Sequence, residues 1–222
     1  MEIFEKVLGI SNNKEVICYS ISNSKGIEVK ILNYGGIITD ILTPDRNNKR
    51  ENIVLKYKNW ESYIDNTSYL GALIGRTGGR ICNGEVYLGD KKLVLSKNYN
   101  PNQGHGGNEG FNKKFYEVKC EILQNEAYVE LSRTSPDMEE NYPGNLEVKV
   151  KYILTEDNEL KINYYGKSDK DTLVNMTNHS YFNLSGNGKE DILNHDLYIK
   201  SKSIVELNEN QATTGLLMFI EG

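Results

Sequence analysis

Residues Leu146-Glu-Val-Lys-Val-Lys-Tyr-Ile-Leu154 set the fold class through the alternation of their side chains. The even-numbered positions are all apolar, whereas positions 147, 149 and 151 are charged. A period of two is typical of a β-strand that has one buried face and one solvent face. After the turn residues Glu-Asp-Asn at 156–158, a second run at 160–165 predicts the partner strand of a hairpin.

Strand patterns continue on the N-terminal side of this hairpin. Short runs punctuated by Gly and Asn predict strands at 16–22, 27–32, 37–42, 85–88, 93–96, 116–123 and 128–134. Gly89 lies in a tight turn between two of these runs and is suited to a positive φ. One helical turn is expected at 60–65, and no long window has sustained helical periodicity. The sequence therefore predicts an all-β protein, a large antiparallel β-sandwich that forms one domain over residues 1–222.

The composition is typical of a globular protein, since 38% of the 222 residues are hydrophobic and 26% are charged. Positive and negative side chains are interspersed and the net charge is −5, which argues against a nucleic-acid partner. The N-terminus is acidic where a secretory signal would be basic, and the apolar run at 216–220 is too short to enter a membrane as a span. Cys18, Cys82 and Cys120 lack disulfide or zinc spacing, so a cytoplasmic location is expected.

A glycine-rich loop, Gly75-Arg-Thr-Gly-Gly-Arg-Ile81, carries Arg76 and Arg80. Its glycines let the backbone approach a ligand closely while the guanidinium groups donate hydrogen bonds to it. The same pattern suits arginines that cap carbonyl groups of the loop, and both alternatives stay open. A phosphate site is not favoured, because neither a Gly-Lys-Ser/Thr ending nor a helical pattern follows.

Two histidines lie in segments that favour a functional role. His105 is flanked by glycines within residues 102–107, which leaves its ring free to project into a cleft. His179 lies in Thr-Asn-His-Ser-Tyr-Phe-Asn-Leu at 177–184, between an apolar run and a loop, so we expect it at a strand end. A hydrogen-bonded core histidine is the alternative for His179. Together with His195 these are the three histidines, without His-x-x-x-His spacing, and no metal site is predicted.

A turn-rich connection at 135–146 carries Asp137, Glu139 and Glu140. Two carboxylates that face one cleft can cleave a glycosidic bond, which keeps a glycoside hydrolase as one hypothesis. Acidic residues grouped in one loop are more often solvated surface groups, and that alternative is favoured.

Five motifs give the chain a resemblance to a known family. They are Asn33-Tyr-Gly-Gly36, Gly75-Arg76 with Arg80, His105-Gly-Gly with Gly110-Phe111, Ser135-Pro-Asp137 with Tyr142-Pro-Gly-Asn145, and Thr177 to Leu184. In order and approximate spacing they resemble the aldose 1-epimerases, or galactose mutarotases, over roughly the N-terminal two-thirds of that family. The resemblance implies a β-supersandwich fold. It also implies an isomerase activity that interconverts the α and β anomers of free aldohexoses such as galactose and glucose, without a metal or an organic cofactor.

The resemblance also implies roles for individual residues. Mutarotation needs a base for the anomeric hydroxyl and an acid for the ring oxygen, after which the open aldehyde rotates and recloses. His179 is similar to the family's general acid, and histidine suits that role because it titrates near neutral pH. His105 is implied as a second catalytic residue, and Arg80, His105 and Asn178 are implied as sugar-binding residues. Asn178 is equally suited to orienting the loop through the backbone, and Gly79 stands where the family often has Asn.

The family continues beyond the position that corresponds to Gly222, and its later segment contributes a sugar-binding aspartate and the base glutamate. No counterpart of either is expected in this chain. Glu221 is not assigned as a substitute, because residues 215–222 resemble the strand before that segment. Two hypotheses follow from the resemblance: an active epimerase, and a catalytically impaired carbohydrate-binding remnant of the same fold. The shortened sheet is also expected to expose edges through which the chain self-associates.

Overall fold

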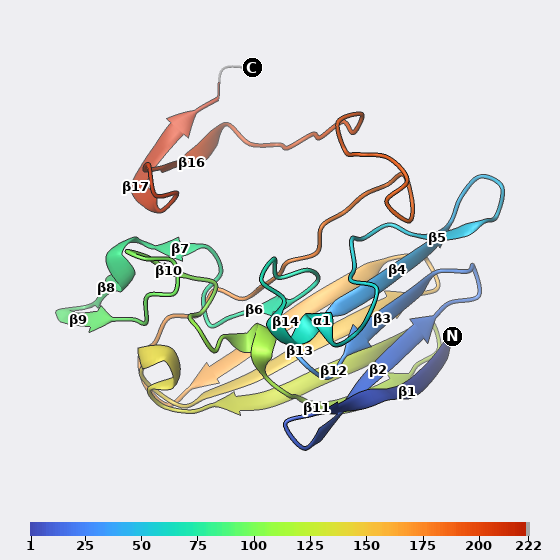
Figure 1. The fold of residues 1–222 in the computed structure, drawn as a ribbon, viewed down its shortest axis with the longest axis horizontal. Helices are drawn as coiled ribbons and strands as arrows, with labels where there is room; N and C mark the ends of the chain where they lie inside the picture. The colour runs from blue at the N-terminus through green and yellow to red at the C-terminus, as the bar shows by residue number, and fades with distance from the viewer. Residues whose placement is uncertain (221–222) are drawn as a thin grey trace.

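A computed structural model describes residues 1–220, and most of its regular structure is β-strand (Figure 1). The first of its two larger sheets is antiparallel, with five strands that are neighbours in chain order. These strands are β1 (Glu2–Ser11), β2 (Lys14–Ser22), β3 (Glu28–Leu32), β4 (Ile38–Pro44) and β5 (Arg50–Asn52). The strands expected at 16–22, 27–32 and 37–42 are confirmed as β2, β3 and β4.

The second large sheet is also antiparallel and contains the alternating stretch at 146–154. Its strands, in spatial order, are β11 (Glu117–Ile122), β12 (Glu126–Ser135), β13 (Leu146–Thr155) and β14 (Leu160–Ser168). In β13 the even-numbered side chains are buried and those at 147, 149 and 151 are half-buried, as the period of two predicts. The antiparallel β13–β14 hairpin is therefore confirmed.

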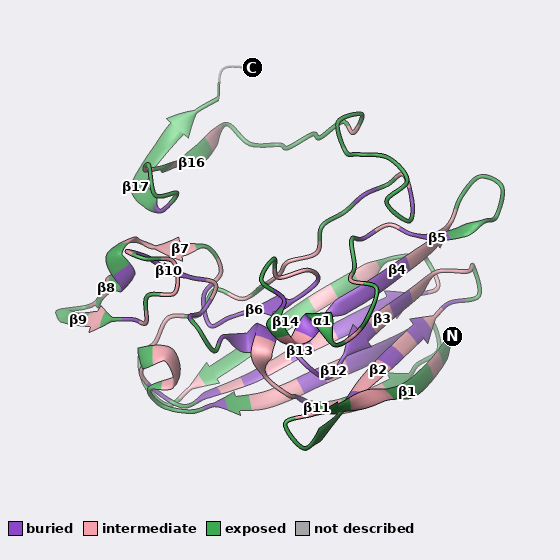
Figure 2. Cartoon of the chain, viewed as in Figure 1, coloured by how far each residue is buried: buried purple, intermediate pink, exposed green. Residues whose placement is uncertain are grey.

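The inner faces of the two sheets pack together and form the main hydrophobic core (Figure 2). Ile21 and Ile31 of the first sheet and Val129, Leu131 and Val150 of the second are all fully buried. Burial of apolar surface is the dominant favourable term in folding, so this core holds the two sheets as a rigid sandwich. The expected all-β sandwich is confirmed.

Short elements gather beside the sandwich and carry the loops of interest (Figure 1). The short strands are β6 (Leu73–Ile74), β7 (Arg80–Ile81), β8 (Glu85–Leu88), β9 (Lys91–Val94), β10 (Gln103–Gly104) and β15 (Thr177–Asn178). The helical turns are α1 (Ser62–Asp65), η1 (Cys82–Gly84), η2 (Phe111–Lys113) and η3 (Glu139–Asn141). Within residues 1–220, no helix has the length and hydropathy needed to cross a membrane.

Two local predictions can be compared with these short elements. The helical turn expected at 60–65 is confirmed by α1. The β8–β9 hairpin is also present, and Gly89 in its turn has a φ of +57°. Strand β9, however, begins at Lys91 rather than at 93, because the chain reverses over two residues instead of four. The predicted strand at 93–96 is therefore displaced towards the turn.

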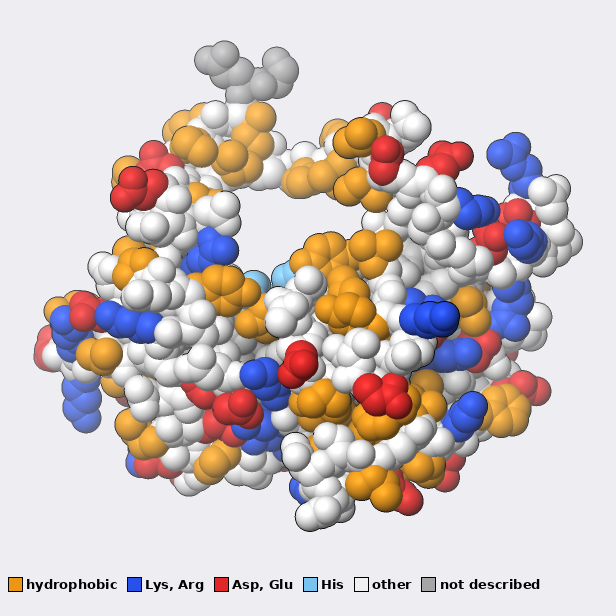
Figure 3. Space-filling view, in the orientation of Figure 1, with side chains coloured by type: hydrophobic (Ala, Val, Ile, Leu, Met, Phe, Trp, Pro, Cys, Tyr) orange, Lys and Arg blue, Asp and Glu red, His pale blue; other side chains and the backbone are white. Residues whose placement is uncertain are grey.

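The chain ends in a C-terminal arm, residues 189–220, that stands away from the sandwich (Figure 1). It contains an extended segment at 189–202 and the hairpin of β16 (Ser203–Leu207) with β17 (Thr213–Phe219). All side chains of β17 are exposed, and Phe219 is 85% exposed. A space-filling view shows an open gap between the arm and the sandwich, with histidine side chains visible on its floor (Figure 3).

Candidate functional site

Two of the three histidines come together where short strands end. His105 directly follows β10 and His179 directly follows β15, so the expected strand-end position of His179 is confirmed. Their ring centroids are 5.1 Å apart and the rings are nearly perpendicular, at 86°. We call these two residues the histidine pair. Both are half-buried, which leaves them accessible to a small ligand.

Backbone hydrogen bonds fix His179 on one side of the pair. Its N–H donates to the carbonyl of Ala72 at 2.9 Å, and its carbonyl accepts from the N–H of Gly71 at 3.1 Å. The Asn178 side chain reinforces this contact: its Nδ2 donates to the Gly71 carbonyl at 2.9 Å, and its Oδ1 accepts from the N–H of Ser180 at 3.0 Å. Both polar atoms of Asn178 are therefore engaged with the backbone that carries His179.

The loop that carries His105 is held by a side chain outside it. Asn98 Oδ1 accepts from the N–H of Gly104 at 2.7 Å, and its Nδ2 donates to two carbonyl groups of the loop at 2.9 and 3.1 Å. Gly106 has a φ of +89°, and a Cβ at this position would lie 1.7 Å from the carbonyl oxygen of Gly75. Only glycine fits there, which explains why His105 has glycine as its next neighbour.

Three tyrosines surround the histidine pair, and sequence reasoning did not single them out. Tyr69 is near both rings, with centroid distances of 4.8 Å to His105 and 5.8 Å to His179. Tyr181 lies 5.0 Å from His179, and Tyr99 lies 6.3 Å from His105. The chain has 15 tyrosines, and their composition alone gives no basis for choosing these. A signal existed for Tyr181, which is two residues from His179 in the same motif.

The environment of His105 keeps its ring neutral near physiological pH. Burial lowers the pKa of His105 to about 4, and electrostatic interactions with His179 and Arg80 act in the same direction. Within residues 1–220, the buried Nδ1 of His105 and the buried Oγ of Ser180 have no hydrogen-bond partner. Unpaired buried polar atoms are uncommon in folded proteins, and a binding or catalytic role is one explanation for them.

Arg80 lies beside the pair, because β7 is antiparallel to β10 with Arg80 opposite Gly104. Its guanidinium carbon lies 5.1 Å from the ring centroid of Tyr99. Nη1 of Arg80 donates to Oε1 of Gln211 at 2.6 Å and to the carbonyl of Asn210 at 3.2 Å. The structure thus brings Arg80 to the site and joins it to the C-terminal arm.

Arg76, the other arginine of the same loop, has a structural environment. Its side chain is 2% exposed, and burial lowers the pKa of its guanidinium. The group donates to the Oγ and O of Ser135, to Thr172 Oγ1 and to the carbonyls of Pro136, Pro143 and Gly144. Of the two alternatives left open by the sequence, carbonyl capping is therefore correct for Arg76.

The acidic loop does not supply a pair of carboxylates facing one cleft. The Glu139 carboxylate accepts from both terminal nitrogens of Arg133, at 2.7 and 3.0 Å, and Asp137 accepts from Lys170 at 2.9 Å. Glu140 accepts from the backbone N–H groups at 108 and 109, at 3.0 and 2.8 Å. The favoured expectation of a solvated acidic surface is wrong for Glu139 and Glu140, which are half-buried and hold loops in place.

His195 does not join the histidine pair. It lies in the C-terminal arm, where its Nε2 accepts from the N–H of Leu184 at 2.9 Å. In residues 1–220, no three His, Cys, Asp or Glu side chains are grouped so that they could hold a metal ion. Glu221, which was considered as a base, lies outside the described residues.

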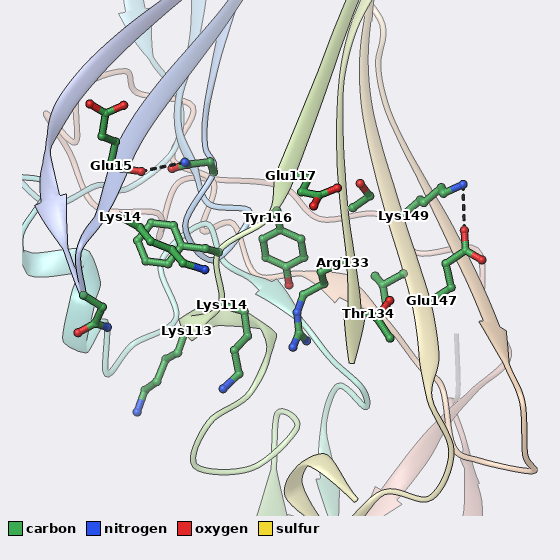
Figure 4. A pocket seen from close by; sticks show the side chains of 15 residues that line it. Lys14, Glu15, Lys113, Lys114, Tyr116, Glu117, Arg133, Thr134, Glu147 and Lys149 are labelled. Carbon is green, nitrogen blue, oxygen red and sulfur yellow. Dashed lines mark hydrogen bonds and ion pairs between the residues drawn. The ribbon is translucent and has the colours of Figure 1, made fainter. Parts of the chain in front are cut away.

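A separate groove of about 810 Å³ is lined by residues of β2, β11, β12 and β13 and of the segment at 113–116 (Figure 4). It is lined by charged side chains, among them Lys14, Arg133 and Lys149, and no histidine takes part. Lys149 is paired with Glu147 at 3.0 Å, and Arg133 is paired with a carboxylate of the acidic loop. The histidine pair is the stronger candidate site, because the pKa of His105 is lowered and its Nδ1 is unpaired within residues 1–220.

Known proteins are similar to this chain in both sequence and fold. The family model described as Aldose 1-epimerase matches residues 18–220. The galactose mutarotase of Rattus norvegicus is 38% identical over 199 residues, which cover 90% of this chain and 57% of that protein. The aldose 1-epimerase of Escherichia coli (strain K12) is 34% identical over 190 residues, which cover 86% of this chain and 54% of that protein.

A solved structure gives the same result for the fold. The galactose 1-epimerase from Lactobacillus acidophilus NCFM superposes with a TM-score of 0.89 at 27% identity, covering 100% of this chain and 64% of that one. The chain therefore spans between half and two-thirds of the length of these relatives. Because the family model matches residues 18–220 of the 222, the chain belongs to the aldose 1-epimerase family.

Proposed function

We propose that this chain is an aldose 1-epimerase that interconverts the α and β anomers of free aldohexoses such as galactose and glucose. The observation that carries the proposal is the histidine pair, whose ring centroids are 5.1 Å apart. Arg80 and the three tyrosines at 69, 99 and 181 lie beside it. A hexose presents a ring oxygen that needs a proton and hydroxyls that need hydrogen-bond partners. Aromatic rings and a guanidinium group suit the sugar faces and hydroxyls.

We assign the general acid to His179. Its proton passes to the ring oxygen O5 as a base removes the proton of the anomeric hydroxyl, and the C1–O5 bond breaks to leave an open-chain aldehyde. After rotation about C1–C2, O5 attacks the other face of C1 and returns its proton to His179, while the carbonyl oxygen takes back a proton from the base, which gives the second anomer. His105, held neutral by its low pKa, and Arg80 are proposed to bind sugar hydroxyls. Asn178 is proposed to orient His179, since its amide already engages the adjacent backbone.

The general base is not assigned to Asp137, Glu139 or Glu140, because each accepts hydrogen bonds from the groups it holds in place. This feature favours a second candidate function, a carbohydrate-binding domain without appreciable epimerase activity. The two functions differ in one measurable quantity, the rate of anomer exchange.

Freshly dissolved α-galactose followed by polarimetry or proton NMR tests the proposal. We expect the wild-type chain to accelerate mutarotation over buffer and His179→Ala to lose the acceleration by about 10²- to 10⁴-fold, the usual contribution of a general acid. His195→Ala is the matched control and is expected to retain wild-type activity, because His195 lies in the arm. A folded wild-type chain that leaves the buffer rate unchanged but binds galactose in calorimetry would establish the second function instead.

We also propose that residues 1–222 form a single domain located in the cytoplasm. The core shared by the two large sheets supports one domain. The cysteines support a reducing compartment, since Cys18, Cys82 and Cys120 are all free. The aldohexose is proposed as the small-molecule partner. A second copy of the chain is proposed as a further partner, supported by the exposed apolar side chains of β17.

A further inference from the structure

The C-terminal arm touches the site through one short turn. Residues 208–212, between β16 and β17, form this arm turn, and Ala212 within it is completely buried although β17 is exposed. The Asn210 carbonyl accepts from Asn102 Nδ2 at 3.2 Å, and Asn208 Nδ2 contacts Cys82 Sγ at 3.8 Å. The arm turn is therefore seated on the β7–β10 pair, the same backbone from which Arg80 and the His105 loop project.

The arm turn has a defined shape of its own. Asn208 Oδ1 accepts from the N–H of Asn210 and from the N–H of Ala212, both at 3.0 Å. The N–H of Asn208 donates to the carbonyl of Ala212 at 2.9 Å, which closes the turn. Gln211, at its tip, has a φ of +57°. A turn held in this way presents the Gln211 side chain in a fixed direction.

The contacts of Arg80 leave part of its guanidinium group for a ligand. Both hydrogen bonds within residues 1–220, to Gln211 and to Asn210, use Nη1. The face of the group lies over the ring of Tyr99, at 5.1 Å. The N–H groups of Nη2 and Nε can therefore donate to a ligand. The amide oxygen of Gln211 is neutral, so its hydrogen bond does not cancel the positive charge of Arg80.

We propose that Gln211 is a positioning residue that holds the Arg80 guanidinium in place to donate a hydrogen bond to a sugar hydroxyl. The arm turn then forms one side of the sugar site. The proposal rests on the proposed function, because it takes Arg80 as a sugar-binding residue. A free arginine side chain samples many rotamers, and a bound sugar would have to immobilise it. Gln211 and Tyr99 restrict those rotamers before the sugar arrives.

The test compares three variants of the whole chain with the wild type. Gln211→Leu keeps the size of the side chain and removes the acceptor, whereas Gln211→Glu restores an acceptor. Thr214→Val is the matched control, because it alters the same hairpin at a hydroxyl that contacts Glu206 rather than Arg80. Rotation of the Arg80 guanidinium is followed by nitrogen-15 NMR, with the signal assigned by its loss in Arg80→Lys. Galactose affinity is measured by calorimetry on the same samples.

We expect slow guanidinium rotation in the wild type, in Gln211→Glu and in Thr214→Val, and fast rotation in Gln211→Leu. Galactose is expected to bind Gln211→Leu about three- to tenfold more weakly, the cost of immobilising one side chain, while the control is unchanged. Fast rotation in the wild type, or galactose binding that is unchanged or tighter in Gln211→Leu, would overturn the proposal. If no sample binds galactose yet the NMR difference is present, the positioning contact stands and the proposed sugar function fails.

Discussion

Arg76 and Arg80 occupy the same glycine-rich loop, and their surroundings give them different roles. The Arg76 guanidinium is enclosed by carbonyl and hydroxyl acceptors from three segments of the chain. Arg80, four residues later, is half-buried at the edge of the histidine pair. One residue holds the loop, and the other is available to a ligand. Both are arginines that directly follow a glycine, so the local sequence does not distinguish them. Their burial and their hydrogen-bond partners in the folded chain do.

Arg76→Lys is expected to lower the free energy of unfolding by about 3 kcal/mol or more. A lysine has one nitrogen for the acceptors that the guanidinium satisfies, and buried acceptors without donors are costly. Urea denaturation followed by circular dichroism measures the change. Arg46→Lys, at an exposed position of the β4–β5 loop, serves as the control and is expected to change stability by less than about 0.5 kcal/mol. Equal stability of both variants would contradict the structural role of Arg76.

His105 is expected to make stability depend on pH in the acid range. Its folded pKa of about 4 lies below the ordinary value near 6.5, so the unfolded chain binds more protons between those two pH values. The free energy of unfolding therefore falls as the pH falls from 6.5 towards 4. His105→Gln has no such group, so the difference between wild type and variant shrinks over that window.

Urea unfolding at several pH values between 7 and 4 measures this difference, and NMR titration of the ring gives the folded pKa directly. His195→Gln is the control, because this histidine lies in the arm and does not join the histidine pair. A titration midpoint of His105 near 6.5 would show that the ring is not desolvated as the structure implies.

The loop at 104–110 depends on contacts made by other elements. Glu140, in the helical turn η3, accepts from two backbone N–H groups of this loop and from the Ser96 hydroxyl. Asn98 holds its other end. The loop itself is rich in glycine and has few side chains to pack, so its shape is imposed from outside.

Glu140→Ala is expected to loosen the loop. Two N–H groups lose their acceptor, so we expect hydrogen exchange of the amides at 108 and 109 to accelerate and the free energy of unfolding to fall by about 1–2 kcal/mol. Glu117→Ala, an exposed carboxylate of β11, is the control for loss of a negative charge. Unchanged exchange in Glu140→Ala would mean that the glycine-rich loop is held by its remaining contacts alone.

The molecule consists of a well-packed sandwich and an arm whose β17 side chains are all exposed. The β16–β17 hairpin pairs only with itself among residues 1–220, and Leu216, Leu217 and Phe219 are 63%, 61% and 85% exposed. A two-stranded sheet with exposed apolar faces and free edges is a surface to which another chain readily adds. This is why a second copy of the chain was proposed as a partner.

Self-association is expected at micromolar concentrations and is measured by light scattering during size exclusion. The double variant Leu217→Lys with Phe219→Lys is expected to shift the chain towards the monomer, since charges on an edge strand oppose pairing. Tyr87→Lys replaces an exposed apolar residue of the β8–β9 hairpin and is the control. A wild-type chain that stays monomeric at every concentration would exclude the proposed association.

The elements predicted from the sequence are those whose pattern is local. Strand β13 alternates apolar and charged residues, and burial follows that alternation because side chains of a strand point to opposite faces in turn. Strand β1 was missed, since its side chains are mostly exposed or half-buried at the sheet edge and show no regular alternation. The motifs at 102–107 and 177–184 identified both members of the histidine pair for a similar reason. A histidine among small and polar residues can be recognised from one short segment of the sequence, without knowledge of the rest of the chain.

Contacts between distant segments were decided only by the folded chain. The approach of Tyr69 to both histidines, the burial of Arg76 but not Arg80, and the contact of Gln211 with Arg80 all depend on how the loops cross in space. A local pattern records which face of an element is apolar, because that property repeats every two residues. It carries no record of which loop lies opposite, because that is set by the packing of the two sheets and by the hydrogen bonds that fix each loop to its neighbours.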